Sequence, residues 1–139
     1  MKLNRIVLTE QENRDRVVQE VIAKVLSMSV TSHYWHWQTK SYAEHKALGD
    51  FYEKMTEQAD LLAEQFMGAG GEFQIAVNTE MMPYSKDKVV EELEDFKKSI
   101  VEVETELMKD ENGPMHGVAD TMIDVIKEVD TLLYLLTLE

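Results

Sequence analysis

Apolar residues in this 139-residue chain recur at alternating steps of four and three, and four separate segments repeat this spacing. In an α-helix such a spacing places residues on one stripe of the surface, which is the seam of a left-handed helix bundle. The sequence therefore predicts an all-α protein folded as a four-helix bundle. The four stripes are Val18, Ile22, Val25, Ser29, Ser32 and His36; Leu48, Tyr52, Met55, Ala59, Leu62 and Phe66; Val89, Leu93, Phe96, Ile100, Val103 and Leu107; and Val118, Met122, Val125, Val129, Leu132 and Leu136.

Signals at the ends of these segments place the four helices. Residues 9–12 and 41–44 both fit a capping box, in which a hydroxyl and a carboxylate three residues later bond the first free amides of a helix. The glycine-rich stretch at residues 68–71 ends the second segment, and Glu-Asn-Gly-Pro at residues 111–114 separates the third from the fourth. We expect helices at about residues 10–39, 42–67, 86–110 and 116–138.

The connection between the second and third helices, at about residues 68–86, is much longer than the other two. A hairpin needs only a few residues, whereas an extended chain needs about twelve to return along a helix of roughly 25 residues. The second and third helices should therefore run parallel, which is the ferritin-like arrangement, and residues 1–139 should form one such domain. Apolar side chains in the connection predict that it packs on the bundle: Phe73, Ile75, Val77, Met81, Met82 and Tyr84.

Composition and charge narrow the possible functions. The chain has no cysteine, which excludes disulfides, thiolate zinc sites and thiol nucleophiles, so that histidine, aspartate and glutamate are the strong metal ligands available. The formal charge of −13 would repel a phosphate backbone, so we expect no nucleic-acid partner. Residues 1–9 lack the apolar core of a signal peptide, and no apolar stretch approaches the roughly 20 residues of a membrane span. We expect a cytoplasmic protein without a membrane partner.

Four residues form a candidate set of metal ligands: His36 near the end of the first helix, and His45, Asp60 and Glu64 on the second. A helix rises about 1.5 Å per residue, which places His45 roughly 22 Å from Asp60 and roughly 28 Å from Glu64. One chain therefore cannot close the set around an ion, and a second copy must complete it. Singly, a histidine at a helix C-terminus is also favourable without a metal, and isolated acids are usually solvated. His33, one turn before His36, is either a substitute ligand or a surface histidine.

The stretch His36-Trp37-Gln38-Thr39-Lys40, followed by His45 and then by Asp60 and Glu64, resembles the ferroxidase segment of the Dps family. Dps proteins are mini-ferritins that protect DNA during starvation. Their signature is His-Trp-Asn, a second histidine at the start of the next helix, and an aspartate and a glutamate four residues apart. The resemblance covers about a quarter of the chain, centred on the turn between the first two helices.

The resemblance implies that His36 and His45 of one subunit and Asp60 and Glu64 of its two-fold mate bind iron, with Trp37 beside the site. It also implies a ferroxidase, which oxidises Fe(II) with peroxide or oxygen under oxidative stress and sequesters the iron in a closed homo-oligomer. Another divalent metal would fit the same ligands. Family members that bind DNA often carry a lysine-rich tail, and residues 1–5 hold only two basic residues, so DNA binding is not expected here.

Three small residues, Gly49, Thr56 and Ala63, recur every seven positions on one flank of the second helix. Small residues let helices approach closely, so this flank predicts that two copies pair through their second helices across a two-fold axis, with two identical metal sites. The chain departs from the Dps pattern in the shorter spacing between its two histidines and in Gly49, which stands where the family often has an acidic ligand. These departures favour an alternative: a ferritin-like structural or interaction protein with a degenerate or absent metal site. An unrelated enzyme has no motif behind it.

Overall fold

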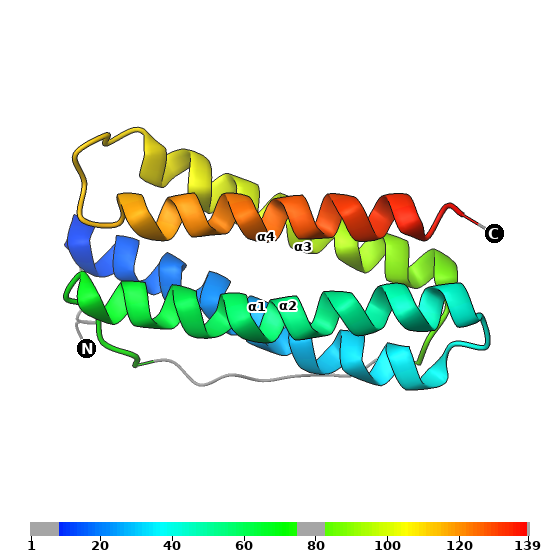
Figure 1. Ribbon diagram of the computed structural model, residues 1–139. Helices are drawn as coiled ribbons and strands as arrows, with labels where there is room; N and C mark the ends of the chain where they lie inside the picture. The colour runs from blue at the N-terminus through cyan, green and yellow to red at the C-terminus, as the bar shows by residue number, and fades with distance from the viewer. Residues whose placement is uncertain (1–8, 75–82, 139) are drawn as a thin grey trace, which may run out of the picture.

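The computed structural model describes residues 9–74 and 83–138, and within these ranges the chain is a bundle of four helices without strands (Figure 1). The helices are α1 (Glu10–Gln38), α2 (Tyr42–Gly68), α3 (Lys86–Met108) and α4 (His116–Leu135). Each helix begins and ends within three residues of its predicted bounds. The prediction of an all-α four-helix bundle is confirmed.

The directions of the helices follow from contacts at their ends (Figure 1). Lys86, at the start of α3, forms an ion pair of 3.3 Å with Glu44 in the first turn of α2, so these two helices begin at the same end of the bundle. Thr121, early in α4, donates a hydrogen bond of 2.7 Å to Gln65 near the end of α2, so α4 starts where α2 finishes. α2 and α3 therefore run parallel. Each packs against both α1 and α4, so that α2 and α3 lie at diagonal corners of the bundle.

The described ends of the connection between α2 and α3 are both tied to α1. The backbone N–H of Gln74 donates to the Gln19 side chain at 2.8 Å, and that of Tyr84 donates to the Gln38 side chain at the same distance. Gln19 and Gln38 are about 28 Å apart along a helix axis. The connection thus joins widely separated points of the bundle. Residues 75–82, with four of the apolar side chains predicted to pack there, lie outside the described residues.

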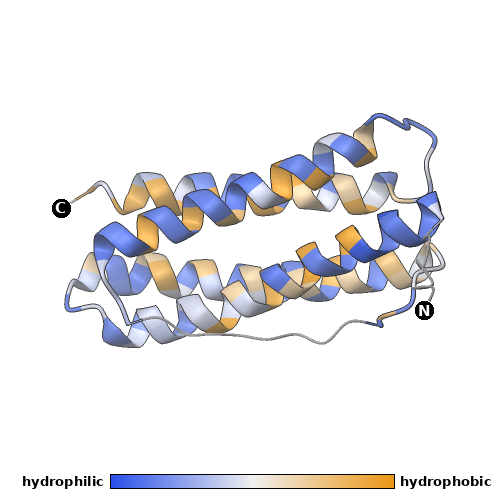
Figure 2. Cartoon of the chain, turned by 180° about the vertical axis from the view of Figure 1, so that it is seen from behind, coloured by the Kyte–Doolittle hydropathy of each residue, from blue (hydrophilic) through white to orange (hydrophobic). Residues whose placement is uncertain are grey.

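The predicted stripes supply the core. Every stripe residue is buried except His36, Tyr52 and Val103, which are partly exposed. Trp35 is also fully buried, and it has the largest side chain of the core. Figure 2 shows hydrophobic and hydrophilic positions interspersed along each helix. Among the described residues, no helix combines the length and the apolar character that crossing a membrane requires.

The two predicted capping boxes have different outcomes. At the start of α1, Thr9 accepts a hydrogen bond from the Glu12 N–H at 3.1 Å, and Glu12 accepts one from the Thr9 N–H at 3.3 Å, which confirms the first box. At the start of α2, Ser41 caps the Glu44 N–H at 3.3 Å, but the Ser41 N–H donates to Thr39 Oγ1 at 3.2 Å. The second capping box is therefore only half formed. The Glu44 carboxylate does not accept the Ser41 N–H and instead bonds to Thr39 and Tyr84.

Glycines end α2 as predicted. The helix finishes at Gly68, and Gly70 has a φ of 96°, in the left-handed region that only glycine adopts readily. A Cβ at Gly71 would lie 2.4 Å from ring carbons of Phe66, so the missing side chain lets the chain pass close to that buried ring.

Candidate functional site

The turn between α1 and α2 brings two of the four predicted metal ligands into contact. The rings of His36 and His45 are stacked, with centroids 3.7 Å apart and planes 17° from parallel. His36 Nδ1 lies 2.5 Å from the carbonyl oxygen of His45, and His45 Nδ1 lies 2.7 Å from the carbonyl oxygen of His36. A carbonyl oxygen only accepts, so each Nδ1 carries a proton and donates it. In a neutral ring, Nε2 is then the unprotonated nitrogen, the atom that binds a metal ion.

Aromatic side chains surround this imidazole pair. The His33 ring is stacked on Tyr52, with centroids 3.8 Å apart and planes 8° from parallel. Tyr52 also meets His36 edge to face at 5.3 Å, and His33 lies 4.6 Å from the ring of Trp37. Trp37 is 66% exposed, so this cluster reaches the surface of the α1–α2 pair. His33 therefore packs on a tyrosine near the pair, with a centroid distance of 6.3 Å to His36.

Gly49 lies against the Cε1–Nδ1 edge of the His36 ring. A Cβ on Gly49 would be 3.0 Å from His36 Cε1 and 3.2 Å from His36 Nδ1. The small-residue pattern predicts that the second helix of another copy packs at Gly49. In the structure, the His36 side chain of the same copy lies there. The small-residue flank predicted for pairing of second helices is therefore shortened to Thr56 and Ala63, of which Thr56 is exposed and Ala63 partly buried.

Asp60 and Glu64 are exposed on α2, about 22 Å and 28 Å along the helix axis from His45. Within the part of the chain that the structure describes, no three histidine, aspartate or glutamate side chains gather closely enough to hold a metal ion. A single chain therefore brings His36 and His45 together and leaves Asp60 and Glu64 apart from them. The site shared between two copies stays a prediction.

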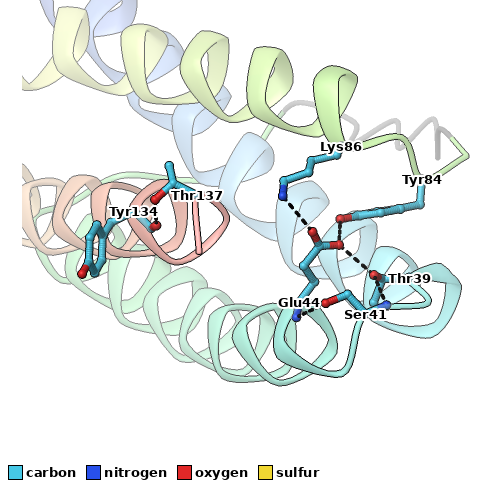
Figure 3. A network of polar contacts seen from close by, with 7 residues as sticks. All are labelled: Thr39, Ser41, Glu44, Tyr84, Lys86, Tyr134 and Thr137. Carbon is cyan, nitrogen blue, oxygen red and sulfur yellow. Dashed lines mark hydrogen bonds and ion pairs between the residues drawn. The ribbon is translucent and has the colours of Figure 1, made fainter. Parts of the chain in front are cut away.

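A second polar cluster lies at the same end of the bundle, centred on the buried carboxylate of Glu44 (Figure 3). Glu44 Oε2 accepts hydrogen bonds from the hydroxyl of Tyr84 and, at 2.9 Å, from the hydroxyl of Thr39. Glu44 Oε1 lies 3.3 Å from the ammonium of Lys86. These contacts join the α1–α2 turn, the first turn of α2, the end of the long connection and the start of α3. We call the four residues Thr39, Glu44, Tyr84 and Lys86 the Glu44 cluster.

The cluster shifts the protonation of two of its members. Burial raises the pKa of Glu44, but the hydrogen bonds from Tyr84 and Thr39 and the charge of Lys86 together outweigh burial and hold this pKa below its ordinary value. Burial, reinforced by the hydrogen bond to Glu44, raises the pKa of Tyr84 to about 12. At neutral pH the carboxylate is therefore charged and the phenol is protonated, so that the phenol is the donor.

A mostly apolar hollow of about 280 Å³ lies at the opposite end of the bundle, between the start of α1 and the α3–α4 turn. None of the candidate ligands lines it. Its walls are Asn13, Arg14, Val17, Val103, Glu106, Leu107, Asp110, Gly113, Pro114 and Met115. The hollow is therefore separate from the pair of His36 and His45.

Sequence reasoning missed the Glu44 cluster and the stacking on Tyr52. Glu44 and Tyr84 are 40 residues apart in the sequence, so no local spacing links them. The one local signal, the Ser-x-x-Glu pattern at residues 41–44, pointed to a helix cap rather than to a buried carboxylate. Tyr52 occupied a core position of the second stripe, and nothing in the pattern marked it as a partner of His33.

Comparison with known proteins gives one family. A family of unknown function, DUF5856, matches residues 36–136, a range that includes His36, His45, Gly49, Asp60 and Glu64 and excludes His33. No curated protein and no solved structure matches the chain. Because the match covers well over half of the chain, the protein belongs to the DUF5856 family.

Proposed function

We propose that this member of the family is a ferritin-like, Dps-type protein in which two copies together bind and oxidise ferrous iron. The observation that supports this best is the imidazole pair of His36 and His45. Their Nδ1 protons are held by carbonyl oxygens, which leaves both Nε2 atoms for metal ions. Asp60 and Glu64 of the second copy supply oxygen ligands.

The course of the chain supports the ferritin-like assignment. Two short turns join α1 to α2 and α3 to α4, while the connection between the parallel helices α2 and α3 is long. This is the connectivity that distinguishes ferritin-like bundles from simple up-and-down bundles. The exposed position of Asp60 and Glu64 suits ligands that serve a neighbouring copy.

The orientation of the rings favours two ions over one. A metal ion lies in the plane of the imidazole that binds it, and the planes of His36 and His45 are 17° from parallel at a centroid distance of 3.7 Å. Their lone pairs therefore do not converge, and each ring holds its own ion. Asp60 and Glu64 of the second copy would supply the oxygen ligands to these ions.

The reaction is a transfer of electrons from bound iron to peroxide. Each ferrous ion loses one electron, so two ions reduce one molecule of hydrogen peroxide, which takes up two protons and leaves as two waters. Carboxylates stabilise the ferric product because hard oxygen ligands favour the higher charge. The formal charge of −13 attracts cations to the protein, and a closed homo-oligomer would retain the oxidised iron.

Iron oxidation by matched variants tests this proposal. Fe(II) is added without oxygen, peroxide follows, and ferric absorbance is recorded for the wild type and for a His45→Ala, Asp60→Ala double variant. A His116→Ala, Asp120→Ala variant is the control, because it removes the same residue types from exposed positions on α4. We expect the wild type and the control to oxidise iron well above the rate in buffer, and the first variant to fall to that rate. Equal rates for all three proteins and buffer would refute the ferroxidase.

A structural or interaction protein is the second candidate. The observation that favours it is Gly49, which is covered by His36 and cannot offer the acidic ligand common in the Dps family. For this candidate, the protein would assemble with itself and bind no iron. The solution mass and the iron content of the protein are measured with and without Fe(II). An assembly that binds no iron supports the structural candidate.

A further inference from the structure

Gly49 lies within α2, about two turns after the helix begins at Tyr42. Glycine weakens a helix relative to alanine because it loses more backbone entropy on folding. Its backbone does not have a positive φ, since among the described residues only Gly70 does, so conformational freedom is not the reason for a glycine here. The reason must lie in what covers the position.

The His36 ring covers it and has little room to move. A Cβ at residue 49 would come within 3.0 Å of His36 Cε1 and 3.2 Å of Nδ1, closer than ordinary van der Waals contact. The His36 ring also contacts the stacked ring of His45, at a centroid distance of 3.7 Å, and the edge of Tyr52, at a centroid distance of 5.3 Å. The hydrogen bond from His36 Nδ1 to the His45 carbonyl fixes the ring in its plane.

We propose that Gly49 is a positioning residue, which forms a seat for His36 and thereby fixes the interlocked His36–His45 pair in the arrangement that presents both Nε2 atoms to metal ions. The metal part of this inference rests on the proposed function. A side chain at residue 49 would force the His36 ring to shift, so an acidic ligand at this position and the observed place of His36 conflict. The short turn between α1 and α2 and the glycine are thus two parts of one arrangement.

Unfolding in urea tests the seat without any metal. Gly49→Ala is compared in the wild-type background and in a His36→Ala background. If Gly49 seats His36, alanine lowers the unfolding midpoint when the ring is present, and raises it when the ring is absent because only the gain in helix propensity remains. Gly68→Ala is the matched control, since Gly68 also lies in α2 and has no atom within 4 Å of an added Cβ. Its effect should be the same in both backgrounds. The same sign for Gly49→Ala in both backgrounds would overturn the seat.

Binding of Co(II), followed by its visible absorption, tests the positioning of the metal ligand. Loss of a group that orients a ligand weakens metal binding by about tenfold or more. We expect this weakening for Gly49→Ala and wild-type affinity for Gly68→Ala. Wild-type affinity in Gly49→Ala would overturn the positioning role. If the wild-type protein binds no Co(II), the proposed function fails as well, and the urea comparison alone decides whether Gly49 seats His36.

Discussion

A buried carboxylate is costly unless every oxygen is paired, and Glu44 shows how one chain meets that requirement. Its two oxygens are bonded to Thr39, Tyr84 and Lys86, which come from two different stretches of the sequence. A carboxylate whose pKa is held below its ordinary value stabilises the fold above that value, and the contribution is lost as the pH falls through the pKa of the folded state. The cluster therefore holds the end of the long connection more strongly when Glu44 is charged than when it is protonated.

Tyr84→Phe removes one donor from this carboxylate without changing the shape of the ring. A hydrogen bond to a charged group contributes about 1.5 kcal/mol or more, so the variant should be destabilised by about that amount near neutral pH. Because the pKa of Tyr84 is raised to about 12 in the folded protein, wild-type stability falls as the pH rises from about 10 toward 12, and the variant lacks this loss. Urea unfolding at about pH 8 and about pH 11 should show that the difference in stability between the wild type and the variant is smaller at the higher pH. Tyr134→Phe, at an exposed tyrosine, should leave neutral-pH stability unchanged.

Single residues were predicted unevenly. Trp35 was not on a predicted stripe, yet it is fully buried, whereas Trp37, two positions later on the other side of the helix, is 66% exposed. His36 and His45 were predicted as ligands from their positions, whereas their stacking and mutual hydrogen bonds depend on the geometry of the turn, which spacing alone does not fix. Glu44 was assigned to a helix cap because its local pattern matched, and long-range partners overrode that pattern.

At the scale of helices, the sequence was more informative because helix ends are decided locally. The Thr9 capping box and the glycines after α2 depend on neighbouring residues, and both were predicted. The junction of α1 and α2 is different. Thr39, the residue after α1, accepts the Ser41 N–H and donates to Glu44, so one hydroxyl links the turn to the buried cluster.

Thr39→Val should therefore weaken the junction between α1 and α2. The change keeps the shape of the side chain but removes two hydrogen bonds. The bond from the Ser41 N–H contributes about 1 kcal/mol and the bond to the charged Glu44 about 1.5 kcal/mol or more, so we expect a loss of about 2.5 kcal/mol in the free energy of unfolding. Thr131→Val is the control, because the hydroxyl of Thr131 is exposed and bonds to the Lys127 carbonyl within α4. A loss no greater than that of the control, measured by urea unfolding, would show that Thr39 does not link these elements.

At the scale of the whole molecule, the lengths of the helices and connections in one chain predict the four-helix bundle, but they do not predict how copies of the chain assemble. Four apolar stripes of similar length bury one another, and the length of a connection limits where the next helix starts. Nothing comparable in one chain fixes how a second copy docks. Gly49 illustrates the difference, because the sequence placed it at a contact between copies and the structure covers it with the chain's own His36.

Mixing two inactive variants should restore metal binding if the site is shared between copies. A His36→Ala, His45→Ala variant keeps only the carboxylates, and an Asp60→Ala, Glu64→Ala variant keeps only the imidazoles. If copies exchange freely in two-fold dimers, half of the dimers contain one of each and have one intact site of two, so the mixture should bind about a quarter of the wild-type amount of Co(II). Each variant alone should bind none. A mixture that binds no more than the separate variants after exchange, confirmed by mass measurement, would show that the four residues do not meet across the dimer.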